Sequence, residues 1–129
     1  MRLIAHRGFA ATAPENTISA VERASRRADE VTIDVRRCDS GELVAIHDPT
    51  VDRVTDGTGA VCRHTLSELQ SLTVLGKEQI PTLDAMLQAV PASVGVTLDL
   101  HEIGLAHDVL RLADRADVHV TVSSGFAHE

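Results

Sequence analysis

The chain has 129 residues, of which 43% are hydrophobic and 24% are charged. These proportions are typical of a folded globular domain and exclude an intrinsically disordered chain. The formal net charge of −7 argues against a nucleic-acid-binding protein, which would normally carry a basic face. We expect a single domain, because domains commonly have roughly 100–200 residues.

The apolar runs are no longer than β-strands, so they exclude a transmembrane helix. The N-terminal run, Met1–Ala5, meets a histidine too early to be the hydrophobic region of a secretory signal. The two cysteines, Cys38 and Cys62, are too few for a disulfide scaffold or a cysteine-rich metal site. We therefore expect a cytoplasmic protein with two reduced thiols and no stable membrane insertion.

Short apolar runs rich in β-branched residues predict five strands. The runs are near-continuous rather than alternating, which is typical of strands buried on both faces of a parallel sheet. The predicted strands are Leu3–Ala5, Val31–Val35, Leu43–Ile46, Val94–Leu100 and Val118–Val122.

Apolar residues at helical spacing lie between most of these strands. Asn16 or Thr17 is the candidate N-cap of the first helix, Ser67 of the second and Thr82 of the third. Strands that alternate with helices predict an α/β fold. The predicted helices cover residues 18–28, 67–72, 83–90 and 105–116.

Residues 49–66 interrupt the alternation of strands and helices. The segment is rich in turn-forming residues, among them Asp56, Gly57 and Gly59, and it is longer than an ordinary loop between a strand and a helix. Insertions of this kind usually cover or shape a site.

Polar and ionisable residues cluster at the C-terminal ends of the predicted strands, while the N-terminal ends show no such cluster. In parallel α/β proteins the carboxyl edge of the sheet holds the active site. These residues are His6 and Arg7, then Thr32, Asp34 and Arg36, then His47 and Asp48, then Asp99, His101 and Glu102, and finally Ser123 and Ser124.

Asp34 and His47 share that edge only if the second and third strands run parallel. Residues 36–42 must then bring the chain back. Seven extended residues span roughly 23 Å at about 3.3 Å each, against roughly 17 Å for a five-residue strand, so the return is feasible. The alternative is a hairpin that turns at Asp39–Gly41 and separates Asp34 from His47. The local pattern by itself favours the hairpin.

Four short motifs occur in a specific order and spacing. They are HRG at residues 6–8, PENT at 14–17, DV at 34–35 and HD at 47–48. Together these motifs resemble the glycerophosphodiester phosphodiesterase family, and the likeness covers nearly the whole chain. The resemblance implies a TIM-type (β/α)8 barrel with a small insertion, here at about residues 49–79. It also implies the parallel arrangement of the second and third strands.

Enzymes of this family hydrolyse glycerophosphodiesters to glycerol 3-phosphate and an alcohol, in phospholipid and glycerol metabolism, with Mg²⁺ or Ca²⁺. The resemblance implies that His6 and His47 are the general acid and base, a role that suits imidazoles near neutral pH. It implies further that a glycerol hydroxyl of the substrate attacks first and that water then opens a cyclic phosphate.

The resemblance also assigns the side chains around the two histidines. A guanidinium fork suits a phosphate, and a carboxylate oxygen suits a hard cation. The expected roles are substrate-phosphate binding by Arg7 and His101, metal ligation by Asp34, Asp99 and more weakly Thr32, and support of the edge by Glu15, Asn16 and Asp48.

Two strands depart from the family's pattern. Thr32 stands where the family has Glu, and Asp99 and His101 stand where it has a Glu-x-Lys pair. Loss of an anionic ligand weakens a site for a hard cation. Two alternatives to an active enzyme therefore stay open: a degenerate or truncated relative that at most binds phosphate esters, and a fragment without independent function.

A complete barrel of this type has about 250 residues. We therefore interpret residues 1–129 as a partial domain that contains about five of eight strands. An incomplete barrel is expected to leave an open sheet edge and exposed aliphatic faces, which favour self-association. A small glycerophosphodiester is the expected partner.

Overall fold

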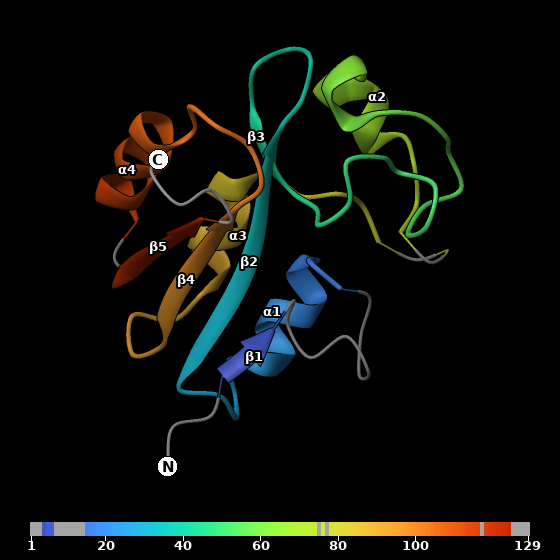
Figure 1. Ribbon diagram of the computed structural model, residues 1–129. Coiled ribbons are helices and arrows are strands. Elements are labelled where there is room, and N and C mark those ends of the chain that lie inside the picture. Colours follow the sequence, from blue (N-terminus) through green and yellow to red (C-terminus); the bar gives the residue numbers. More distant parts are fainter. Residues whose placement is uncertain (1–3, 7–14, 75, 77, 117, 125–129) are drawn as a thin grey trace.

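The chain folds around a β-sheet of mainly parallel strands (Figure 1). The computed structural model describes residues 4–6, 15–74, 76, 78–116 and 118–124. The sheet has the order β1-β2-β4-β5, and each of these strands pairs in parallel with the next, as consecutive βα units do. The strands are β1 (Ile4–His6), β2 (Glu30–Arg37), β4 (Gly95–Leu100) and β5 (Val120–Ser124).

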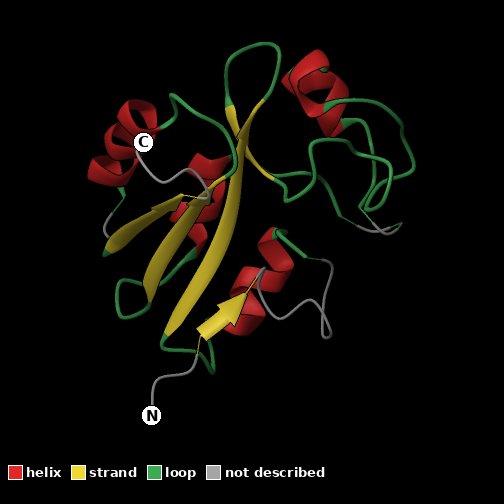
Figure 2. Cartoon of the chain, in the orientation of Figure 1, coloured by secondary structure: helices red, strands yellow, loops and turns green. Residues whose placement is uncertain are grey.

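One face of the sheet packs against helices α1 (Ile18–Ala24), α3 (Leu83–Ala89) and α4 (Ala106–Arg115) (Figure 2). Alternate residues of β2 and β4 point to this side, and in-register pairs such as Ile33 and Leu98 are fully buried there. Apolar side chains from the strands and helices form the main core of the molecule.

The opposite face of the sheet is polar in the described part of the chain. Thr32 pairs in register with Thr97, and Asp34 pairs with Asp99. On the neighbouring strand, Thr121 and Ser123 continue these two rows and are exposed. The predicted exposed aliphatic face is therefore absent from this side among the described residues, because the residues that alternate with the buried valines and leucines are hydroxyl or carboxylate residues.

The third predicted strand runs antiparallel to β2, so the prediction of a parallel arrangement is wrong. β3 (Leu43–Ala45) pairs with the last residues of β2, and residues 38–42 join the two strands. Gly41 closes this loop at φ +99°, a conformation that glycine adopts without strain. The sheet consequently contains four parallel strands from the predicted five, with β3 attached to the end of β2.

The helix caps match the predicted ones at two of three positions. Thr17 and Thr82 accept hydrogen bonds from the first turns of α1 and α3. The short helix α2 (Leu66–Gln70) begins earlier than predicted, because Thr65 rather than Ser67 is its cap. The side chain of Glu68 bonds back to the N–H of Thr65 and completes a capping box.

Residues between β3 and α3 form a second, smaller core. This segment contains the 3-10 helix η1 (Val61–Arg63) and α2, and it lies beside the far end of β2 (Figure 1). We call it the insertion. Its buried apolar residues are Val51, Val54, Val61, Leu69, Val74 and Ile80, packed with Cys38, Val44 and Ile46.

No helix in the described ranges is long and apolar enough to cross a membrane. Cys38 is buried, Cys62 is exposed, and both are free thiols, as predicted. Three large apolar residues of the described chain are exposed, namely Ile103, Leu110 and Val122.

Candidate functional site

Asp34 and His47 lie together although their strands are antiparallel. β2 extends two residues beyond its last pairing with β4, and β3 folds back along this overhang. The N–H of Ile46 donates to the carbonyl of Asp34 at 3.1 Å, so the next residue, His47, returns to the edge of the parallel sheet. The expectation that a hairpin separates the two side chains is therefore wrong. Donor atoms of Asp34 and His47 lie within 4.8 Å of each other.

Asp34 is 3% exposed and is held in place by Asn16. The amide Nδ2 of Asn16 donates to Asp34 Oδ2 at 2.9 Å, and its Oδ1 accepts from the backbone N–H of Asp34 at 3.1 Å. Asn16 has φ +53°, which lies in the left-handed region that asparagine tolerates better than most residues. This conformation just before α1 aims the amide at the end of β2.

His101 follows β4 and turns toward both carboxylates of the edge. Its Nε2 lies 2.7 Å from Asp34 Oδ1 and 3.7 Å from Asp99 Oδ2. The backbone N–H of His101 donates to the carbonyl of Val35 at 3.3 Å, which continues the pairing of the two strands. The structure therefore places the imidazole of His101 on the carboxylate of Asp34.

His47 approaches His101 from the end of β3. The two rings lie edge to face with centroids 4.9 Å apart. His47 Nδ1 is 2.8 Å from Asp48 Oδ1, and its carbonyl accepts a hydrogen bond from Arg36 Nε at 2.9 Å. Because Asp48 engages Nδ1, Nε2 is the ring nitrogen that is left for chemistry at the site.

Arg53 joins the insertion to this edge. Its guanidinium donates to both carboxylate oxygens of Glu15 at 2.9 and 2.8 Å, and to both of Asp48 at 2.8 and 3.1 Å. The hydrogen bond from Arg53 holds the pKa of Asp48 well below its usual range. The hydrogen bonds to Glu15, followed by those to Asp48, raise the pKa of Arg53. Asp48 is thus an anion that orients His47.

Arg53 carries no predicted role at the site, and Arg36 is predicted only as one of the polar residues at the strand ends. The signal that could have identified Arg53 is the spacing Asp48-x₄-Arg53 in a turn-rich segment, which lets the two side chains meet across the turn.

Other residues predicted at this edge are Thr32, His6, Arg7 and Glu102. Thr32 is 8% exposed and lies on the same face of β2 as Asp34, one step further from the edge. His6 ends β1 and pairs in register with Thr32, while Arg7 lies outside the described residues. The carboxylate of Glu102 accepts from the backbone N–H of Arg37 at 2.6 Å and is therefore committed elsewhere.

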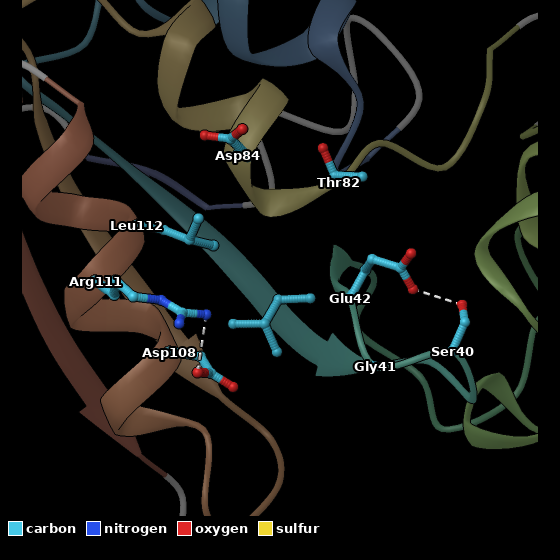
Figure 3. A pocket seen from close by; sticks show the side chains of 9 residues that line it. Ser40, Gly41, Glu42, Thr82, Asp84, Asp108, Arg111 and Leu112 are labelled. Carbon is cyan, nitrogen blue, oxygen red and sulfur yellow. Dashed lines mark hydrogen bonds and ion pairs between the residues drawn. The ribbon is translucent and has the colours of Figure 1, made fainter.

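A hollow of about 460 Å³ in the described part of the chain does not coincide with this edge. Figure 3 shows that it lies between the tip of the β2–β3 hairpin and helices α3 and α4. Two of its carboxylates have partners: Ser40 donates to Glu42 at 2.5 Å, and Arg111 pairs with Asp108 at 3.3 Å. One oxygen of the third, Asp84, is buried and has no hydrogen-bond partner among the described residues. The hollow contains no histidine, so we place the functional site at the sheet edge.

The edge carries a donor set for a divalent cation. Ligand atoms of Asp34, His47 and His101 all lie within 4.8 Å of one another, and Asp99 stands beside His101. Carboxylate oxygens and imidazole nitrogens are common metal ligands in proteins. The residues therefore fit a divalent cation, with Asp34 the most buried of the ligands.

Comparison with known proteins identifies the family. Residues 6–122 match the Glycerophosphoryl diester phosphodiesterase family. The chain belongs to this family. It is 42% identical over 96 residues to a glycerophosphodiester phosphodiesterase of Caldanaerobacter subterraneus, covering 68% of this chain and 40% of that protein.

Solved structures of the family share the fold. A glycerophosphodiester phosphodiesterase from Agrobacterium tumefaciens matches with a TM-score of 0.89 and 32% identity, over 98% of this chain and 58% of that one. An Oleispira antarctica phosphodiesterase in complex with sn-glycerol-3-phosphate matches with a TM-score of 0.88 and 30% identity, with the same coverage. The chain covers 51% of the length of a curated Bacillus subtilis relative and smaller shares of others, for example 34% of a human one. The predicted fold, the N-terminal part of a TIM-type barrel, is confirmed.

Proposed function

We propose that this edge is the catalytic edge of a metal-dependent glycerophosphodiester phosphodiesterase that releases glycerol 3-phosphate and an alcohol. The observation that carries the proposal is the meeting of Asp34, His47 and His101 at the carboxyl edge of the sheet, in a chain of this family. The Oleispira antarctica relative, whose complex contains sn-glycerol-3-phosphate, supports a small phosphate ester as the ligand.

His47 exchanges a proton at Nε2 in this proposal. Asp48 holds Nδ1 at 2.8 Å, and Arg53 holds Asp48 in its ionised form. A carboxylate on the far ring nitrogen fixes the tautomer of an imidazole and stabilises it when it takes up a proton. His6, at the end of β1, is the proposed second member of the acid–base pair, and Arg7 is the proposed phosphate contact.

Asp34 and Asp99 hold the cation in this proposal, with Mg²⁺ or Ca²⁺ as the expected ion. When bound, the cation polarises the phosphoryl oxygen and neutralises charge that develops on it. Asn16 keeps the carboxylate of Asp34 oriented through its hydrogen bond to Oδ2. His101, 2.7 Å from Asp34 Oδ1, adds positive charge near the phosphate when it is protonated.

The second candidate is a phosphate-ester-binding relative without catalysis. Thr32 favours it, because a neutral, nearly buried hydroxyl occupies the position where the family carries a carboxylate. A relative of this kind binds glycerol 3-phosphate at the same edge and releases none from a diester.

Hydrolysis of glycerophosphocholine, measured as released glycerol 3-phosphate with and without Mg²⁺ or Ca²⁺, separates the two candidates. We expect metal-stimulated release by the wild-type chain and a loss of roughly 10²- to 10⁴-fold in His47→Asn, the usual contribution of a general acid or base. His107→Asn, a change at an exposed histidine of α4, is the matched control and should retain the activity.

The variant Thr32→Glu completes this experiment by restoring the carboxylate. Release that appears only in Thr32→Glu supports the non-catalytic candidate for the wild-type chain. Absence of metal-stimulated release in both proteins rejects the enzyme.

A further inference from the structure

Two imidazoles and one buried carboxylate converge at the edge, and this is an unusual donor set for a hard cation. We propose that Asp34, His47 and His101 form a binding site for a transition-metal ion of the Zn²⁺ class, and that such an ion removes His47 from proton transfer. The binding site stands on geometry alone, whereas the effect on proton transfer rests on the proposed function.

Two of the three ligands, Asp34 and His47, already have a neighbour on the side-chain atom that would not bind the ion. Asn16 donates to Asp34 Oδ2 at 2.9 Å, and Asp48 contacts His47 Nδ1 at 2.8 Å. A carboxylate on the distal nitrogen of a metal-binding histidine is the usual second shell of zinc sites, because it fixes the ring and raises its basicity. Arg53 in turn fixes Asp48. The hydrogen-bonded neighbours that a metal-binding histidine needs are therefore already in place around His47.

The spacing of the three side chains suits a small ion. Ligand atoms about 2.0–2.2 Å from Zn²⁺ are roughly 3–4 Å apart. His101 Nε2 and Asp34 Oδ1 are 2.7 Å apart as a hydrogen-bonded pair, and the atoms of all three ligands fall within 4.8 Å. An ion that replaces the proton between His101 and Asp34 needs only a small opening of this pair.

The ligand atoms available at this edge indicate which kind of metal ion the site prefers. Mg²⁺ and Ca²⁺ take six or more oxygen ligands, whereas imidazole nitrogen suits Zn²⁺, Co²⁺ and related ions. Two nearby carboxylates, Glu15 and Asp48, are each bound on both oxygens by Arg53. Thr32 offers only a neutral hydroxyl. Asp99, 3.7 Å from His101, is then the remaining carboxylate of the described edge that can join Asp34.

Metal ligation and proton transfer at His47 exclude one another. A ring nitrogen that donates its lone pair to an ion has none left for a proton, and the other nitrogen is engaged by Asp48. Zn²⁺ is therefore expected to inhibit the hydrolysis that Mg²⁺ or Ca²⁺ supports.

Direct metal binding tests the site without reference to activity. The wild-type chain is titrated with Co²⁺, whose visible ligand-field spectrum reports nitrogen ligands, and Zn²⁺ is then added to displace it. We expect one ion per chain, bound at least 100-fold more tightly than Mg²⁺. His101→Gln and, independently, His47→Gln should each weaken Co²⁺ binding by at least about 10- to 100-fold, the range that loss of a supporting partner alone produces.

The matched control is His107→Gln, which changes an exposed histidine of α4 and should leave Co²⁺ binding unchanged. Asp48→Asn should weaken binding by about 10-fold or more through His47. Circular dichroism of each variant verifies that it is folded, and the two histidine variants together guard against the misfolding of one.

The outcomes separate this inference from the proposed function. Co²⁺ binding that survives both histidine variants, or that is no tighter than Mg²⁺ binding, overturns the site. Hydrolysis that continues at full rate with Zn²⁺ bound overturns the effect on His47. Metal binding as expected, with no hydrolysis under any condition, supports the site and rejects the proposed function.

Discussion

The sheet and the insertion hold their halves of the site in different ways. On the sheet side, Asp34 and Asp99 are fixed by parallel register above a core of fully buried residues. On the insertion side, His47 and Asp48 follow a three-residue strand, and their side chains depend on Arg53, which is 49% exposed. The site therefore lies where the rigid sheet meets the insertion, which is held by fewer contacts.

This difference predicts where the molecule is robust. Strand register moves many residues together, so a single substitution does not displace Asp34 from Asp99. The orientation of His47 rests on a few charged contacts near the surface, where ion pairs contribute little to folding free energy. Substitutions in the sheet should therefore lower global stability, and substitutions in the insertion should change the site first.

The largest expected effect is that of a cavity in the sheet core. Leu98 is fully buried among residues of the main core, so Leu98→Ala should lower the free energy of unfolding by about 2–5 kcal/mol. Leu69→Ala, at an equally buried position of the smaller core, should fall at the lower end of that range, because the smaller cluster relaxes more readily around a cavity. Urea denaturation measures both.

Hydrogen exchange sharpens this first comparison. The Leu69 variant should expose the amides of the insertion while those of β2 and β4 stay protected, as expected for local unfolding. Equal loss of protection in both regions would contradict the distinction between a rigid sheet and a lightly anchored insertion. Leu110→Ala, at a position 56% exposed, is the control and should change stability by less than about 0.5 kcal/mol.

A smaller effect is expected where α1 meets the sheet. Asn16→Gly keeps the left-handed backbone and removes both hydrogen bonds to Asp34, so it should cost about 1–3 kcal/mol, the cost of depriving a buried polar group of a partner. Asn16→Ala should cost about 1 kcal/mol more, because alanine is strained at positive φ. Thermal or urea unfolding of the pair measures the two contributions, and an equal loss in both variants would show that backbone strain at this position is negligible.

Much of the fold could be predicted from the pattern of apolar residues. Four parallel strands, two helix caps and the polar carboxyl edge follow from local spacing. The local pattern also favours the observed direction of β3, through the turn at Gly41, whereas the parallel strand implied by the family likeness is wrong. The hairpin is correct, but the expectation that it separates His47 from Asp34 is wrong.

The reason lies in strand length. The apolar run that predicts β2 ends at Val35, but the strand continues through Arg36 and Arg37, whose charges concealed its pairing with β3. That overhang gives β3 a place to pair beyond the sheet and still return His47 to the edge. The contact between His101 and Asp34 was equally hidden, because it depends on the register of β2 with β4, which no local pattern specifies.

The smallest expected effect on stability, and the most informative about the insertion, is that of Arg53→Met. The hydrogen bond from Arg53 lowers the pKa of Asp48 in the folded state. A lowered folded-state pKa stabilises the protein above the ordinary pKa of an aspartate, and this contribution is lost as the pH falls toward the lowered value. The wild-type chain should therefore exceed Arg53→Met by up to about 1 kcal/mol at pH 7, and the difference should shrink steadily below pH ~4. Urea denaturation from pH 7 to pH 2 measures this difference, with Arg63→Met, at an exposed arginine of η1, as the pH-independent control. A difference between wild type and Arg53→Met that stays constant over this range would mean that Arg53 anchors the insertion through packing of its side chain rather than through the charge of Asp48.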